Sequence, residues 1–196
     1  MWGELCGLME ADYFAILRLE RKLTVNSEEL QGCYDTRCQE VHPDSGGAAV
    51  EFEEVRRAYV ELRSPGRRLR HWLELGGRRF EEGGALPQVV MEHFGGIGDL
   101  LQESGRVEER HATAQSALGR SMAERAGLAL LPRLQTARER TEELIQDLEA
   151  RFGEFEDDGG SSSSAQEEAI EAARALLFLE KWEIQLREAW GKLGCW

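Results

Sequence analysis

The residues best suited to chemistry are His42 and Asp44, which flank Pro43 between two segments with helical patterns. Proline cannot continue the helix before it, because it has no N–H and its ring fixes φ. It also disfavours the helical conformation at His42. We therefore expect the imidazole and the carboxylate to project from a stiff, exposed turn. Polar residues on a loop held by rigid elements often carry function.

Three interpretations of this triplet are open. His42 and Asp44 could be the acid–base pair of a small hydrolase, although no nucleophile or third group accompanies them at a suggestive spacing. They could form an ordinary polar turn, or they could dock on another protein. The other histidines, His71, His93 and His111, stand on separate helical segments without the spacing of metal ligands. We therefore predict no catalytic residue, metal site or cofactor.

The composition narrows the class of protein. The chain has 196 residues, of which 41% are hydrophobic, and a net charge of −13. Phosphate binding needs a positive surface, so nucleic acid is not an expected ligand. No run of about twenty apolar residues could span a membrane, and residues 1–6 lack the pattern of a signal peptide, so we expect a cytoplasmic protein. The scattered cysteines argue against structural zinc or a disulfide framework: they are Cys6, Cys33, Cys38 and Cys195.

The segments around the triplet predict an all-α first domain over residues 1–76. A cap and acidic residues near Asn26 start a helix of about 27–41, and apolar residues spaced by three and four predict a second helix of about 48–63. The break at Ser64-Pro65-Gly66 is followed by a short helix with arginines pointing outward and apolar residues inward. The inward residues are Leu69, Trp72 and Leu73.

A glycine-rich linker, residues 77–86, separates this domain from a predicted three-helix bundle over residues 87–196. Pro87 is placed in the first turn of the first helix. A long helical segment follows from about 107 to 152, and Pro132 should kink or divide it. Residues 153–164, rich in acids, glycine and serine, read as a disordered loop. The last helix is expected from about 165 to 193.

Several motifs of the first half follow one another in order: Asp12-Tyr13-Phe14-Ala15-Ile16-Leu17, Leu30 and Tyr34, His42-Pro43-Asp44, and the series Phe52, Val55, Ala58, Tyr59, Leu62, Pro65, Arg68 and Trp72. With these motifs the first domain resembles a J-domain, and the whole chain resembles the HscB family of iron–sulfur co-chaperones. In the second half, Arg174–Lys181 is similar to the last helix of that family.

The resemblance implies a function. The His-Pro-Asp turn would dock on a DnaK/HscA-type chaperone ATPase and promote its ATP hydrolysis, while the C-terminal bundle would carry a client, an IscU-type cluster scaffold. The protein would thus activate an enzyme without being one. The implied ATPase-binding residues are Tyr34, Arg37, His42, Pro43, Asp44, Arg56 and Arg57. The implied client-binding residues are Val90, Met91, Phe94 and Phe178.

Two departures from the family pattern bear on these sites. The helix before the triplet has Asp35 and Thr36 where J-domains usually have basic residues, which predicts weaker steering toward an acidic ATPase surface unless the later arginines supply it. Gly95 and Gly98 replace acidic residues beside the client patch.

Structural alternatives also remain open. The arginines could pair with Glu54 and Glu61 within a helix, and the client-patch residues could belong to the core of the bundle. The alternative function is an interaction or scaffold protein with a degenerate J-domain.

Overall fold

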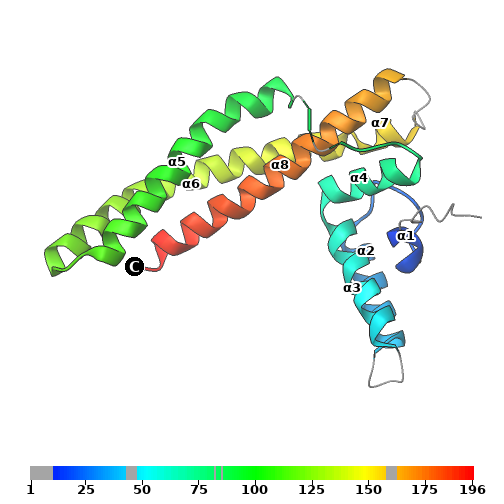
Figure 1. Cartoon of the computed structure of the whole chain (residues 1–196), viewed down its shortest axis with the longest axis horizontal. Helices are drawn as coiled ribbons and strands as arrows, with labels where there is room; N and C mark the ends of the chain where they lie inside the picture. Colours follow the sequence, from blue (N-terminus) through cyan, green and yellow to red (C-terminus); the bar gives the residue numbers. More distant parts are fainter. Residues whose placement is uncertain (1–10, 43–47, 82, 85, 158–162) are drawn as a thin grey trace, which may run out of the picture. The chain divides into compact units, whose positions relative to one another are not determined.

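The computed structural model describes residues 11–42, 48–81, 83–84, 86–157 and 163–196. It confirms the all-α fold class, since the described residues form helices and no strand. None of these helices is long and apolar enough to cross a membrane. The helices are α1 (Tyr13–Ile16), α2 (Ser27–Glu40), α3 (Ala49–Arg63), α4 (Pro65–Leu75), α5 (Gln88–Thr113), α6 (Ala117–Ala150), α7 (Phe152–Asp157) and α8 (Ser163–Gly194) (Figure 1).

The chain divides into two compact units whose boundaries differ from those expected. The first unit joins Met1–Glu82 to Phe152–Ala173, and the second joins Gly83–Arg151 to Arg174–Trp196. The sequence placed everything after residue 87 in the bundle. The structure instead groups α7 and the first part of α8 with the N-terminal unit.

In the first unit, α1, α2 and α3 pack around an apolar cluster. Side-chain caps define its helix starts: Asp12 caps α1, Asn26 caps α2, and Ser64 caps α4, with Pro65 in the first turn. The buried faces of α1, α2 and α3 meet in the core, where the most buried residues are Phe14, Leu17, Leu30, Val41, Val55, Ala58 and Leu62.

The expectation for α4 was wrong at one position. Leu69 and Leu73 are buried and Trp72 is half-buried, as expected. Arg68, however, points inward and is buried. Its Nη1 donates to the carbonyl of Leu62 at 2.8 Å, and its guanidinium lies 5.5 Å from the ring centroid of Phe152. The hydrogen bond and the cation–π contact offset part of the cost of burying the charge.

Residues 153–157 contradict the expected disordered loop. They belong to α7, in which Phe152 and Phe155 are buried one turn apart. The carboxylate of Glu156 accepts hydrogen bonds from the backbone N–H groups of Leu23 and Thr24 and from the Thr24 hydroxyl. The rest of that expected loop includes residues 158–162, which lie outside the described part of the chain.

The second unit is the expected bundle of three helices, α5, α6 and the later part of α8. Its core includes Val90, Ile97, Leu134, Leu179 and Leu186. Two local expectations were wrong: residues 114–116 interrupt the segment assigned to one helix, and Pro87 precedes α5 as its N-cap instead of occupying its first turn. At Pro132, α6 continues without division.

Candidate functional site

The end of α2 positions His42. Val41 is buried in the core of the first unit, whereas His42 is exposed just after the helix. The His42 ring meets the edge of Phe52, in the first turn of α3, with centroids 5.6 Å apart and planes at 80°. Pro43 and Asp44, the other two residues of the predicted triplet, lie outside the described residues.

A shallow depression of about 390 Å³ lies beside His42. It is lined by Tyr34, Cys38, Gln39, His42 and Phe52, which come from α2, the turn after it, and α3. Positions 34, 38 and 42 are spaced by four and therefore follow one side of the chain. An open depression of this kind suits contact with a protein surface better than enclosure of a small substrate.

Tyr34 joins this depression to the core. Its ring stacks on Tyr59 with centroids 4.2 Å apart, and the Tyr59 hydroxyl donates to Gln31. The pKa of the Tyr34 hydroxyl is raised mainly by a hydrogen bond with Cys38 and, to a smaller extent, by burial. Tyr34 therefore holds α2 against α3 and presents one edge to the depression.

The charge of Arg37 is compensated within the first unit. Its Nε donates to the carbonyl of Ile16 at 3.1 Å, and its guanidinium forms an ion pair with Glu40. Arg18 also contacts Glu40, at 2.9 Å. The hydrogen bond from Arg37 is the main cause that lowers the pKa of the Glu40 carboxyl. At the end of α2, two arginines therefore share one carboxylate, which compensates one of their two positive charges.

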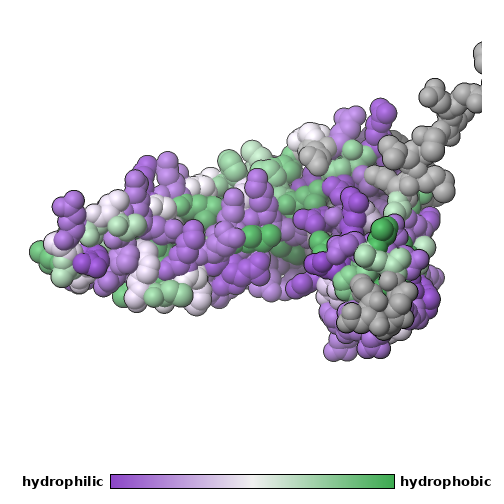
Figure 2. All heavy atoms as spheres, turned by 60° about the horizontal axis from the view of Figure 1, so that its bottom comes forward, coloured by the Kyte–Doolittle hydropathy of each residue, from purple (hydrophilic) through white to green (hydrophobic). Residues whose placement is uncertain are grey.

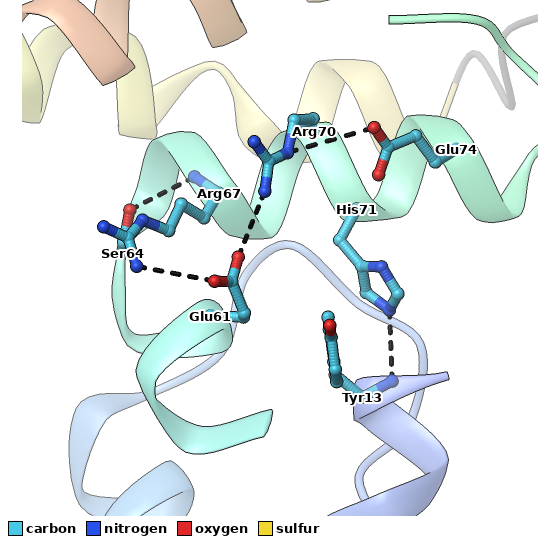
Figure 3. Close-up of polar contacts among 7 residues, drawn as sticks. All are labelled: Tyr13, Glu61, Ser64, Arg67, Arg70, His71 and Glu74. Carbon is cyan, nitrogen blue, oxygen red and sulfur yellow. Dashed lines mark hydrogen bonds and ion pairs between the residues drawn. The ribbon is translucent and has the colours of Figure 1, made fainter. Parts of the chain in front are cut away.

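Several arginines after α2 are also paired, one of them within a helix turn as expected and two across a longer separation in sequence. Arg56 pairs with Glu53 at 3.0 Å, while Arg67 and Arg70 share Glu61 at 3.4 and 3.2 Å (Figure 3).

Arg57 differs from these arginines. Its side chain is exposed, and it has no ion-pair partner among the residues that the structure describes. It therefore retains a positive charge on the outer side of α3.

His71, which the sequence left without a role, ties α4 to α1. Its Nε2 accepts a hydrogen bond from the backbone N–H of Tyr13 at 3.1 Å (Figure 3). The His71 ring is buried and contacts the rings of Tyr13 and Phe14 at 4.4 and 5.8 Å between centroids. It satisfies an N–H at the start of a helix, which would otherwise lack a partner.

A second candidate surface lies on the bundle, where apolar side chains reach the surface (green in Figure 2). The side chains of Met91 and Phe94 are 52% and 45% exposed, and Phe178 is half-buried. The Phe94 ring lies 6.3 Å from that of Phe178 and 5.2 Å from that of Trp182. Trp182 is buried and supports the surface, a role that the sequence did not assign.

Val90 does not belong to this surface. Its side chain is fully buried in the core of the bundle, so we correct its expected role as a client contact. Gly95 and Gly98 are exposed, and a Cβ atom at either position would meet nothing within 4 Å. Neither glycine is required by packing inside the chain. The surface formed by Met91, Phe94 and Phe178 is called the aromatic patch below.

Comparison with known proteins finds one similar sequence and two similar structures. The chain is 32% identical over 97 residues to the chaperone protein DnaJ 1 of Nocardia farcinica, a match that covers 48% of this chain. The chain spans about a quarter of the length of that protein, 24%. No family model matches.

Solved structures extend the likeness to nearly the whole chain. The chaperone HscB from Vibrio cholerae superposes with a TM-score of 0.55 at 18% identity and covers 91% of this chain and 96% of its own. The human co-chaperone protein HscB superposes with a TM-score of 0.51 at 21% identity. The match covers 92% of this chain and 82% of the human protein's chain. This protein therefore has an HscB-like fold.

Proposed function

We propose that this protein is a J-domain co-chaperone. Its first unit docks on a DnaK/HscA-type chaperone ATPase in the cytoplasm and stimulates ATP hydrolysis. The observation that carries this proposal is the exposed His42 at the end of α2 in an HscB-like fold, beside an open depression. His42, with Pro43 and Asp44, makes the contact that promotes hydrolysis, and Tyr34 holds the helix that presents them.

In this proposal, binding to the ATPase depends more on contacts in the depression around His42 than on surface charge. Arg37 and Arg18 share the single carboxylate of Glu40, and Arg56 pairs with Glu53, so these ion pairs compensate part of the positive charge. Arg57 is an exposed positive side chain on α3 that is available to an acidic surface of the ATPase. Surface charges mainly accelerate encounter, whereas buried apolar contacts slow dissociation. We therefore assign the affinity to the depression around His42.

The aromatic patch binds the client, for which an IscU-type iron–sulfur cluster scaffold is our candidate. Exposed aromatic and methionine side chains are typical anchors of protein interfaces. Phe94 and Phe178 rest on the buried ring of Trp182, which keeps them rigid at the surface. Rigid anchors lose little conformational entropy when a partner binds.

The docking role can be tested by measuring ATP turnover of the organism's DnaK-type ATPases with the wild type and with His42→Gln. We expect the wild type to stimulate one of them and His42→Gln to abolish the stimulation. His111→Gln, a histidine change in the second unit, is the matched control and should stimulate like the wild type. Absence of stimulation by the wild type, for every ATPase tried, would refute the proposal.

A scaffold protein with a degenerate J-domain is the second candidate. The compensated charge around Arg37 favours it, because weak steering would matter little to a protein that no longer activates an ATPase. The two candidates differ in a complementation experiment. A folded His42→Gln variant that restores the cellular role of a deletion strain supports the scaffold, and one that fails supports the co-chaperone.

A further inference from the structure

The imidazole of His42 has an aromatic neighbour on the facing helix, Phe52. The centroids of the two rings are 5.6 Å apart and their planes are at 80°, which is an arrangement that aromatic rings prefer. His42 is exposed and directly follows Val41, whose side chain is 5% exposed. The backbone at His42 is therefore anchored by its neighbour, whereas the direction of the ring depends on the side chains that contact it.

The contact with Phe52 continues a regular series between α2 and α3. Tyr34 stacks on Tyr59 with centroids 4.2 Å apart. His42 lies about two turns after Tyr34, and Phe52 lies about two turns before Tyr59. Neighbouring helices that run in opposite directions pair their residues in this order. The packing between α2 and α3 therefore extends past the end of α2 and reaches the histidine.

Phe52 is itself held firmly. Its ring packs against the core of the first unit, and its backbone N–H donates to the carbonyl of Ala48 at 3.1 Å in the first turn of α3. Ala48 occupies the N-cap position, and its methyl group cannot accept a capping hydrogen bond. Packing of Phe52 on the core thus helps to fix the start of α3, and a ring fixed in this way can restrain its neighbour.

The depression beside His42 shows where this restraint comes from. Among the described residues that line it, Tyr34, Cys38 and Gln39 lie on α2, and Phe52 lies on α3. The residues of α2 belong to the helix that precedes the histidine, so they move with its backbone. Phe52 comes from the other side of the turn and is the side chain through which α3 can set the direction of the imidazole.

We propose that Phe52 is a positioning residue for His42, an inference that rests on the proposed co-chaperone function. The ring of Phe52 limits the orientations of the imidazole before docking, so the contact that promotes ATP hydrolysis forms without a search among rotamers. Orientation of a reacting or contacting group acts on the step after binding. Loss of Phe52 should therefore lower the maximal stimulation of ATP turnover more than it lowers affinity.

The test compares Phe52→Leu with Phe52→Tyr in the full chain. Leucine keeps an apolar side chain on the core but lacks the ring, so maximal stimulation at saturating co-chaperone should fall by about three- to tenfold, the range for loss of an aromatic pair. The co-chaperone concentration that gives half-maximal stimulation should change by less than about twofold. Tyrosine keeps the ring, and Phe52→Tyr should stimulate like the wild type.

Val55→Ala is the matched control, because Val55 is on the same helix, is buried in the same core and does not line the depression. It should lower stability and leave maximal stimulation unchanged. NMR of the free protein gives a second measurement, since the signals of the His42 ring protons depend on a neighbouring aromatic ring. They should shift in Phe52→Leu and stay in place in Phe52→Tyr. Circular dichroism checks folding, and Phe52→Met replaces Phe52→Leu if the leucine variant is unfolded.

Three results would overturn the positioning role. Phe52→Leu would stimulate as strongly as the wild type, or it would raise the half-maximal concentration at an unchanged maximum, which would make Phe52 a docking contact. The third is that the His42 ring signals stay in place in Phe52→Leu. Failure of the proposed function looks different, because the wild type itself would then stimulate no ATPase.

Discussion

The contact between Glu156 and the segment before α2 gives the sharpest test of the two-unit division. Glu156 and Leu23 are 133 positions apart in sequence, and only a first unit that includes α7 brings them together. Glu156→Ala removes the carboxylate that accepts from the buried Leu23 N–H and from the N–H and hydroxyl of Thr24. The change leaves an unsatisfied donor on a residue that is fully buried, with 0% exposure.

The size of the effect follows from these bonds. The two bonds to Thr24 are exposed and water can replace them, so they contribute little. The bond from Leu23 has a charged acceptor, and such a bond is worth about 1.5–3 kcal/mol. A loss of about 2 kcal/mol corresponds to a roughly 30-fold increase in the equilibrium constant for local opening.

Hydrogen exchange followed by NMR measures this opening at single amides. We expect the Leu23 amide to exchange about 30-fold faster in Glu156→Ala, and Glu156→Gln to give a smaller increase because its carbonyl can still accept. Asp157→Ala, a neighbouring exposed acid, is the control and should leave Leu23 unchanged. Equal exchange of Leu23 in Glu156→Ala and Asp157→Ala would refute the assignment of α7 to the first unit.

Three further predictions concern the candidate sites. Phe94→Ala should weaken binding of an IscU-type client by about 30-fold in calorimetry, which is the scale of an interface hot spot. Met122 is also exposed, at 67%, and Met122→Ala is the control that should leave binding unchanged. Equal effects of the two changes would exclude the aromatic patch as the client-binding site. The pKa of His93 is lowered mainly by burial and also by the charge of Arg140. As the pH falls, His93 therefore becomes protonated in the unfolded chain at a higher pH than in the folded chain. The free energy of unfolding should therefore decrease as the pH drops below about 6.5. Urea unfolding at neutral and acidic pH measures this decrease, which should be smaller in His93→Gln than in the wild type. Arg57→Glu should slow association with the ATPase at low salt and leave dissociation unchanged in surface plasmon resonance; an effect on dissociation alone would contradict its steering role.

Helices with both a start signal and a buried stripe could be predicted closely. Asn26 caps α2 and the stripe of α3 is buried at Val55, Ala58 and Leu62, so both helices fall within a residue or so of their expected bounds. The interruption at residues 114–116 has a weaker signal. Its sequence, Ala-Gln-Ser, contains neither glycine nor proline, and its one start signal is Ser116, whose side chain accepts from the Gly119 N–H and caps α6.

Long-range packing also explains why α6 is not divided at Pro132 and why α7 forms. Leu130 and Leu134 flank the proline and are both buried in the bundle core. Their burial offsets the lost hydrogen bond and keeps α6 continuous. In α7, two buried phenylalanines stabilise a short acidic segment whose local sequence favours a loop. In both places tertiary burial outweighs local preference.

The candidate site shows the same limit in its electrostatics. The exposure of His42 could be predicted, because the effect of Pro43 on the helix before it depends only on neighbouring residues. The charge around it could not, since Arg37 finds its partners in Glu40 and in the carbonyl of Ile16, which is 21 positions away. The number of basic residues near a docking site therefore does not give its field, because pairing decides which charges reach a partner. With Arg37 and Arg56 both paired, Arg57 is an exposed side chain that can still contribute to steering. Binding to the ATPase should consequently depend weakly on salt even though the chain carries many arginines.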